Sequence, residues 1–366
     1  MKRDSFFQGL KVVEFAGVLA GPAVGMFFAE LGAEVVKIEN KTTGGDMTRG
    51  WKLPSEDPDS PVSAYFCSVN WGKQHLMLDL NDPNDLQIAL DHARRADVVI
   101  SNFKPASARR LGVDAQSLRA RKPELIYAQI NAFSDPEDER PAFDVVLQAE
   151  AGFLYMTGEA GGPPVKMPVA LIDLIAAHQL KEAILIALLR RARTGEGSVV
   201  STSLMESALA SLANQAGNYL MAGHVPQRMG AQHPNIAPYG DIFHCADGKP
   251  LLLAVGTERQ FGALCRTLGL EWMLEDPDFQ TNKMRVSNRE ALNEALSIAI
   301  STKIFDDLMP MLHAAGVPAA RIRDMRSVFE LPEAQAMILE EKTAEGIETK
   351  RVKTVAFNIQ EQTNNG

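Results

Sequence analysis

The sequence predicts an α/β protein with a Rossmann-like, doubly wound and mostly parallel sheet in a large domain, followed by a smaller α+β domain. Three observations lead to this fold class. Short apolar runs rich in β-branched residues alternate with helical segments through the first two hundred residues or so. The first such runs form a strand-helix-strand unit, which implies parallel pairing. After about residue 205 the sequence changes to small residues, a loop and a hairpin pattern.

The first strand-helix-strand unit covers residues 10–39. "LKVVEFAG" at 10–17 is typical of a buried strand. "GPAVGMFFAELG" at 21–32 predicts a buried helix with Pro22 in its first turn and a glycine at its end. "AEVVKIE" at 33–39 predicts the next strand. Further strands and helices follow in the same alternating order: strands at 74–80, 97–103, 124–133 and 198–204, and helices at 81–96 and 174–193.

The second half has a different organisation. A helix of small residues is expected at 205–223, then a loop to about 240. "GDIFHCADGKPLLLAVG" at 240–256 predicts a hairpin with a tight turn at Asp247-Gly248. Helical segments follow to about 315. The expected division is therefore a large domain over 1–205, a linker over 206–225, a small domain over 226–320, and a linker with a C-terminal return to the large domain over 321–366.

Composition excludes several classes of protein. A formal net charge of −9 argues against nucleic acid as the main partner. The apolar stretch 15–29 is too short for a membrane span, and Asp4 and Glu14 make it unlike a signal peptide. Three cysteines without metal-like spacing fit a reducing compartment. We therefore expect a cytoplasmic protein that has no membrane partner.

Common cofactor and catalytic motifs do not match. "GVLAGP" at 17–22 differs from the glycine pattern of dinucleotide enzymes, although Glu39 could imitate their ribose-binding acid, so NAD is not expected. His233 and His244, with the aspartates near them, lack metal-ligand spacing, so no metal is expected. No serine follows the nucleophile-elbow pattern, which argues against a serine hydrolase.

Asp173 stands out because it interrupts the apolar run "PVALIDLIAA". An unpaired carboxylate in such surroundings is costly. One interpretation is that Asp173 caps the helix that begins near Leu174, accepting its free N–H groups. The other is a nucleophile, kept ionised by the same helix terminus, with those amides available to an oxyanion. The two interpretations are compatible.

Basic residues gather near the predicted carboxyl ends of strands, where open α/β sheets bind ligands. Such an arrangement would suit a ligand that carries phosphate. These residues are Lys41, Arg49, Lys73, Lys104, Arg109 and Arg110.

Seven motifs in one order give the chain a resemblance to the class III coenzyme A transferases, the group that contains formyl-CoA transferase, carnitine CoA-transferase and the α-methylacyl-CoA racemases. The resemblance extends from about residue 8 to about 345. The motifs are "GLKVVEFAGVLAGP", "LGAEVVKIE", "GGDMTRGW", "ADVVISNFKPASARRLGV", "PAFDVVLQAEAG", "RTGEGSVV" and "HPNIAPYGDIFHCADG".

The resemblance implies roles for particular residues. Asp173 falls on the family's catalytic aspartate. The cofactor-binding residues that it implies divide into the loop that approaches the thioester (Val18, Leu19), the adenine pocket (Leu78, Leu80) and the stretch that holds the adenosine diphosphate part (Asn102, Phe103, Lys104, Arg110).

The resemblance also implies a reaction. The aspartate attacks an acyl-CoA thioester to give a mixed anhydride, and the CoA thiolate then converts it into an aspartyl-CoA thioester. An incoming carboxylic acid repeats these steps in reverse. Coenzyme A is thus a co-substrate, the partners are an acyl-CoA and a carboxylic acid, and family members form an interlocked homodimer.

Two other functions stay open at this stage. Racemase members of the family move an α-proton with a histidine in the "FD" motif, where this chain has Phe143, which cannot accept a proton. Glu258 matches a racemase glutamate and keeps the 2-methylacyl-CoA racemase or epimerase as an alternative. A catalytically silent acyl-CoA-binding protein is the third hypothesis.

Departures from formyl-CoA transferase bear on the substrate. That enzyme has glutamine, lysine and tyrosine where this chain has Leu19, Asn131 and Phe133. These differences argue against oxalate. It also has a basic residue in place of Asn40, and Lys41 is the expected substitute beside the CoA phosphates.

Overall fold

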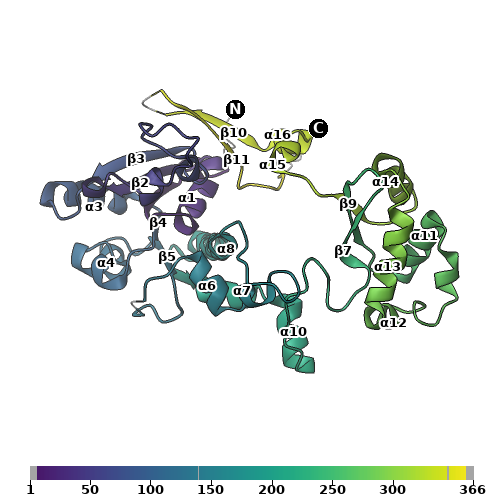
Figure 1. Ribbon diagram of the computed structural model, residues 1–366. Coiled ribbons are helices and arrows are strands. Elements are labelled where there is room, and N and C mark those ends of the chain that lie inside the picture. Colours follow the sequence, from purple (N-terminus) through teal and green to yellow (C-terminus); the bar gives the residue numbers. More distant parts are fainter. Residues whose placement is uncertain (1–5, 139, 344–345, 360–366) are drawn as a thin grey trace, which may run out of the picture. The chain divides into compact units, whose positions relative to one another are not determined.

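The computed structural model describes residues 6–138, 140–343 and 346–359, and its chain divides into two units (Figure 1). The first unit comprises residues 1–152, 167–213 and 333–366, and the second comprises residues 153–166 and 214–332. Each unit has its own sheet.

The first unit is built on a six-stranded sheet with the order β3-β2-β1-β4-β5-β6. Every pair of neighbouring strands in it is parallel, so the predicted α/β class with a mostly parallel sheet is confirmed. The chain winds outward in both directions from the β1–β4 pair, which makes this pair the switch point where α/β sheets bind ligands. The strands are β1 (Lys11–Phe15), β2 (Glu34–Asn40), β3 (Lys73–Leu78), β4 (Val98–Ser101), β5 (Ile126–Asn131) and β6 (Val199–Ser203).

Helices cover both faces of this sheet. On one face α1 (Ala20–Glu30) packs against α8 (Leu171–Thr194), and all residues of α1 are buried, as its apolar sequence predicts. On the other face Val13, Phe15 and Val99 share an apolar core with three helices. These are α3 (Pro83–Arg95), α4 (Pro105–Leu111) and α5 (Ala115–Arg119).

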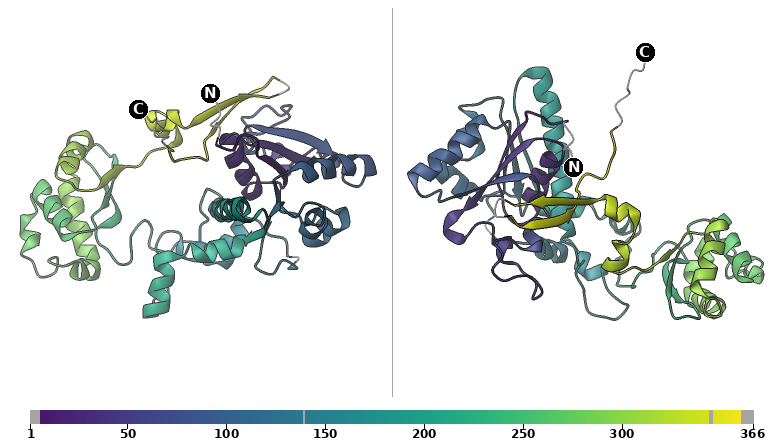
Figure 2. Two further views of the ribbon diagram at one scale, coloured as in Figure 1. Left: turned by 180° about the vertical axis from the view of Figure 1, so that it is seen from behind. Right: turned by 90° about the horizontal axis from the view of Figure 1, so that it is seen from above.

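The C-terminal part returns to the first unit. The hairpin of β10 (Ile338–Lys342) and β11 (Glu348–Val352) runs beside it (Figure 2), where Gly72 N–H donates to the Glu341 carboxylate over 3.0 Å. Thr354 and Val355 then donate backbone N–H groups to Glu30 at the end of α1. The unit also contains η1 (Lys41–Thr43), η2 (Met47–Gly50), α2 (Ala64–Cys67), α6 (Asp144–Glu150) and α9 (Leu204–Ala210).

The second unit has a three-stranded antiparallel sheet with the order β7-β8-β9. β7 (Tyr239–His244) and β8 (Pro250–Ala254) form the predicted hairpin, and β9 (Ala319–Arg321) pairs with β8. Helices pack on it around a core that includes Phe243 and Phe261. They are α11 (Glu258–Leu268), η3 (Glu271–Leu274), α12 (Asn282–Ser287), α13 (Arg289–Ile300) and α14 (Phe305–Ala314). The unit also contains α7 (Phe153–Met156) and α15 (Met325–Val328), while α10 (Ala213–Ala222) and α16 (Pro332–Ala336) begin at the division between the units.

Two local features differ from the sequence-based expectations. The helix expected at 205–223 is divided into α9 and α10, because Ala213 adopts a left-handed φ of 44° at the break. Residues 153–166 group with the second unit, since Arg228 donates to the carbonyl oxygens of Tyr155 and Gly162. In the part of the chain that the structure describes, no helix is both long and apolar enough to cross a bilayer.

Candidate active site

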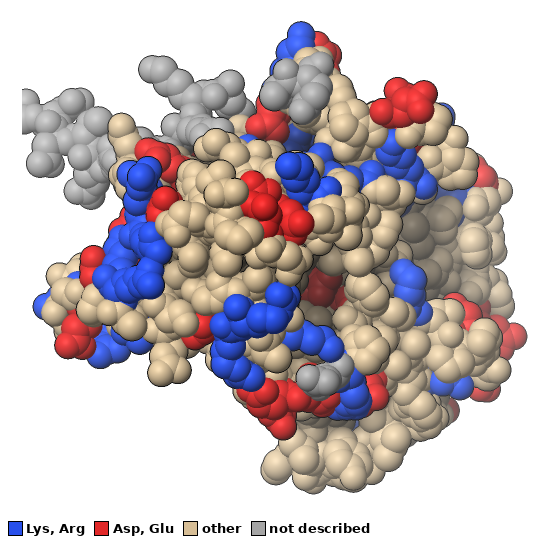
Figure 3. All heavy atoms as spheres, turned by 90° about the vertical axis from the view of Figure 1, so that its left-hand side faces the viewer, with Lys and Arg blue, Asp and Glu red and all other residues tan. Residues whose placement is uncertain are grey.

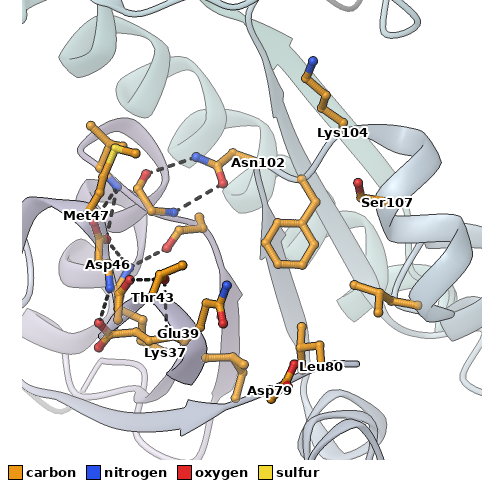
Figure 4. A pocket seen from close by; sticks show the side chains of 18 of the residues that line it. Lys37, Glu39, Thr43, Asp46, Met47, Asp79, Leu80, Asn102, Lys104 and Ser107 are labelled. Atoms are coloured by element: carbon orange, nitrogen blue, oxygen red, sulfur yellow. Dashed lines mark hydrogen bonds and ion pairs between the residues drawn. The ribbon is translucent and has the colours of Figure 1, made fainter. Parts of the chain in front are cut away.

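A cavity of about 580 Å³ opens at the switch point of the first sheet (Figure 4). Its walls come from the segments that follow β1, β2, β3 and β4, so residues far apart in the sequence meet at one edge of the sheet. Asn102, just after β4, reaches across to the β1–α1 turn: it accepts from Gly17 N–H over 3.3 Å and donates to the Gly17 carbonyl over 3.0 Å.

The cavity brings together six of the residues that the sequence comparison had singled out for binding. These are Val18, Leu80, Asn102, Phe103, Lys104 and Arg110. Three others are not part of its lining. Leu78 is buried in the core between the sheet and α3, Leu19 is the buried N-cap residue of α1, and Lys41 is exposed in η1.

Cations flank one side of the cavity. Lys104 and Arg110 line it, and Arg110 donates to Asn81 Oδ1 over 3.0 Å. The neighbouring Arg109 instead pairs with Glu137 at 3.1 Å. Figure 3 shows Lys and Arg side chains gathered in separate groups on the face that carries α3 and α4. An anion would therefore meet a local positive group, although the chain as a whole is acidic.

A buried ionic network lies against the β1–α1 turn. Lys37 Nζ is 2.9 Å from Glu14 Oε1 and 3.0 Å from Asp46 Oδ2, and Lys73 Nζ is 2.8 Å from Glu14 Oε2. Burial opposes ionisation of Glu14, but the two ammonium groups lower its pKa below the ordinary value. Sequence reasoning missed this network, and the single lysine inside the apolar strand "EVVKIEN" was the available signal.

Glu39, at the end of β2, is fully engaged by protein groups. Arg49 binds both of its oxygens, at 2.7 and 2.8 Å, and His75 Nδ1 lies 2.7 Å from Oε1. Despite burial, the bonds to Arg49 and His75 hold the pKa of Glu39 far below its usual range. This carboxylate is therefore not presented to a ribose, as the corresponding acid of dinucleotide enzymes is.

Asp173 lies in the first turn of α8, with a relative exposure of 7 %. The expectation that it caps this helix is wrong, because the helix begins at Leu171 and Asp173 is already its third residue. Asp144 of α6 takes the capping role: its Oδ2 accepts from Ile172 N–H at 2.7 Å and from Asp173 N–H at 3.2 Å. These two amides are thus occupied, and the expectation that they serve an oxyanion is corrected as well.

The electrostatic surroundings of Asp173 also differ from the expectation of a carboxylate kept ionised by the helix terminus. Burial and then the charge of Asp144 raise the pKa of Asp173 to about 7. Near neutral pH this carboxyl group exchanges between its acid and its carboxylate form. A poorly solvated carboxylate with a raised pKa is a stronger nucleophile than an ordinary aspartate.

An aromatic group that includes Tyr65 lies within electrostatic reach of this aspartate. Burial raises the pKa of Tyr65, and the charges of Asp173, Asp144 and Asp46 raise it further, which puts all three carboxylates within electrostatic reach of its hydroxyl. The ring of Trp51 lies 5.1 Å from that of Tyr65 and 6.2 Å from that of Phe143. Tyr65 and Trp51 were not identified as site residues from the sequence, although "GGDMTRGW" contains one of them.

Glu258, in the second unit, is held by neighbours. Its Oε2 pairs with the buried Arg285 at 2.8 Å, and its Oε1 accepts from Asn282 N–H at 3.0 Å. The hydrogen bond from Arg285 lowers the pKa of Glu258. Its carboxylate is thus a stable anion with its oxygens engaged, which makes it a weak proton acceptor.

The described residues contain no cluster of three His, Cys, Asp or Glu side chains arranged to hold a metal ion. Cys67, Cys245 and Cys265 are buried free thiols. Burial raises the pKa of each of them, so they are not activated as nucleophiles.

Comparison with known proteins gives one consistent family. The family model described as CoA-transferase family III matches residues 7–365. The succinate–glutarate CoA-transferase of Agrobacterium fabrum is 38% identical over 334 residues, which cover 90% of this chain and 83% of that protein. The acetyl-CoA:oxalate CoA-transferase of Acetobacter aceti is 35% identical, with 90% and 84% covered.

Solved structures agree with this result. A CAIB/BAIF family protein from Brucella suis is 36% identical and superposes with a TM-score of 0.81, covering 99% of this chain and 94% of that one. The protein Rv3272 of M. tuberculosis, in its orthorhombic crystal form, is 29% identical with a TM-score of 0.82, covering 98% and 94%.

Proposed function

The chain belongs to CoA-transferase family III and is a CoA-transferase, and we propose that it moves coenzyme A between an acyl-CoA and a free carboxylic acid through covalent intermediates on Asp173. The family that the sequence resembles is thereby confirmed. The observation that carries the proposal is a poorly solvated carboxyl group at the start of α8, whose pKa of about 7 is set by burial and by Asp144.

The proposed reaction begins when an Asp173 carboxylate oxygen attacks the thioester carbonyl carbon. The C–S bond breaks, CoA leaves as a thiolate, and a mixed anhydride remains. The thiolate then attacks the aspartyl carbonyl carbon, which releases the first acid as its carboxylate and leaves an aspartyl-CoA thioester. An acceptor carboxylate attacks this thioester, and the expelled thiolate takes the new acyl group, which restores Asp173.

The cavity at the switch point is the proposed CoA site. Lys104 and Arg110 would meet the phosphates, and Leu80 and Phe103 supply apolar surface for the adenine. Val18 is proposed to face the pantetheine end. The assignments of Leu19, Leu78 and Lys41 rest on the resemblance alone, since these residues are not in the lining.

The acids exchanged are proposed to be dicarboxylic acids, because relatives that act on succinate and glutarate, or on succinyl-CoA and mesaconate, are among those most similar to this chain. The rings of Trp51, Tyr65 and Phe143 form an aromatic group, and the Tyr65 hydroxyl in it lies within electrostatic reach of Asp173. An interlocked homodimer and a cytoplasmic location remain predictions.

A panel of acyl-CoA donors and carboxylic-acid acceptors, followed by mass spectrometry in deuterated water, tests this function. We expect succinyl-CoA with a C5 dicarboxylate to give a new acyl-CoA. No deuterium should enter the α-carbon of a 2-methylacyl-CoA, because Phe143 has no exchangeable proton and Glu258 is bound by Arg285. Deuterium uptake without exchange would identify a racemase, and CoA binding with neither reaction would identify a silent binding protein.

A further inference from the structure

Val18 has an unusual backbone conformation. Its φ is +71°, and among the non-glycine residues that the structure describes only Val18 and Ala213 have a positive φ. A β-branched residue in this left-handed region is a steric outlier, since its Cβ meets its own backbone. The surroundings of the β1–α1 turn must therefore hold Val18 in place.

Asp46 is the group that holds it. Val18 N–H donates to Asp46 Oδ2 at 3.1 Å and to Oδ1 at 3.3 Å. On the other side of the turn, Asn102 binds both backbone groups of Gly17. The turn is thus fixed from two different segments, one after β2 and one after β4, and Figure 4 shows both side chains directed at it.

Asp46 is itself held rigidly. Its Oδ2 pairs with Lys37, and its Oδ1 accepts from Thr48 N–H at 3.0 Å and from Thr48 Oγ1 at 2.8 Å. Its own N–H donates to Glu39 over 2.8 Å. Because its side chain is almost completely buried, water cannot replace these partners. Asp46 therefore links the buried ionic network to the backbone of Val18.

The turn that Asp46 holds borders the cavity, whose lining does not include Asp173. Gly17 and Val18 line the cavity, and the charges of Asp46 and Asp173 both act on the hydroxyl of Tyr65. The turn also leads into α1, whose N-cap residue Leu19 offers no side-chain hydrogen bond. The backbone conformation of residue 18 therefore determines the form of this wall of the cavity.

From this geometry we infer that Asp46 is a positioning residue for CoA transfer: it holds Val18 in the left-handed conformation and so fixes the wall along which the thioester meets Asp173. The inference rests on the proposed function. It differs from a purely structural role, in which Asp46 would serve only as the N-cap of η2. In that case the identity of residue 18 would not matter.

A double-mutant cycle separates the two roles. Glycine adopts positive φ without steric cost, so Val18→Gly keeps the conformation of the turn, and its own kcat is the reference for the double variant. Asp46→Ala should lower kcat about tenfold to thirtyfold, since the strained valine loses its anchor. In the Val18→Gly/Asp46→Ala protein, kcat should return to within about threefold of the Val18→Gly value, because the turn no longer needs the anchor. A double variant that is about tenfold or more slower than Val18→Gly would overturn the inference.

Two controls keep the cycle decisive. Asp114→Ala removes another aspartate that caps a short helix, and it should leave kcat unchanged. If Asp46→Ala does not fold, Asp46→Asn replaces it. Both oxygens of Asp46 accept from donors, so the amide nitrogen of asparagine would face a donor in either orientation. We expect a smaller loss of kcat that Val18→Gly again removes, and a loss that persists would overturn the inference.

Crystal structures of the same variants give a readout that does not depend on activity. Residue 18 should leave the left-handed region in Asp46→Ala and keep it in the double variant. A Val18 that holds its φ without Asp46 would contradict the inference. A wild-type protein that exchanges no acid pair would instead refute the proposed function, so the two failures are distinguishable.

Discussion

Replacing Asp173 with asparagine is expected to lower CoA exchange by at least about 10³-fold, because removal of a covalent nucleophile leaves only binding and orientation to act on the substrate. Asparagine keeps the size of the side chain, but its amide cannot form the mixed anhydride. The buried position and the helix should be retained. The loss should therefore appear in kcat, while the affinity for CoA changes little.

Steady-state exchange with the best donor and acceptor pair measures the loss of kcat, and calorimetric titration with CoA measures binding. Asp114→Asn is a matched control, since it makes the same chemical change at the cap of α5. It should keep full activity. Substantial turnover by Asp173→Asn would show that another group carries the acyl transfer.

The same substitution is expected to stabilise the fold above pH 7. The pKa of Asp173 is raised in the folded protein, so the acid form favours folding and the carboxylate opposes it. The contribution of the protonated Asp173 to the free energy of unfolding is fully present below about pH 4 and is lost as the pH rises through about 7. A pKa near 7 instead of about 4 corresponds to roughly 4 kcal/mol. Asparagine does not titrate and escapes this loss.

Urea unfolding at pH 5 and at pH 8 measures this effect. The difference in free energy of unfolding between Asp173→Asn and the wild type should grow by a few kcal/mol between the two pH values, in favour of the variant. Asp114→Asn should show no such gain, since the pKa of Asp114 is lowered by its hydrogen bonds. An equal difference at both pH values would mean that Asp173 is ionised in the fold without cost.

The parallel sheet could be predicted because local signals and tertiary structure agree there. β1, α1 and β2 follow directly from "KVVEF", a buried helix with Pro22, and "EVVKIEN". The carboxyl ends of parallel strands meet at one edge, so the lysine and arginine after β4 were expected at this edge, where the structure has a cavity that both of them line. The family resemblance implied a catalytic role for Asp173, and the apolar neighbours of this residue in the sequence agree with its buried position in the structure.

The contacts that set the chemistry could not be predicted, because they join segments distant in sequence. Asp144 lies 29 residues before Asp173 and binds the start of the same helix, where its charge adds to the effect of burial in raising the pKa of Asp173. Lys37 and Glu14 lie on adjacent strands, and only the observed register brings them together. The left-handed conformation of Val18 could not be predicted from the sequence, because valine disfavours a positive φ.

Chemical trapping on the protein tests the central claim most directly. The enzyme is mixed with its acyl-CoA and hydroxylamine, digested, and analysed by peptide mass spectrometry. If Asp173 carries the acyl group and then CoA, its peptide should contain an aspartyl hydroxamate, formed only when donor is present. Continued CoA exchange with an unmodified Asp173 peptide, or with a hydroxamate on a different residue, would contradict the claim.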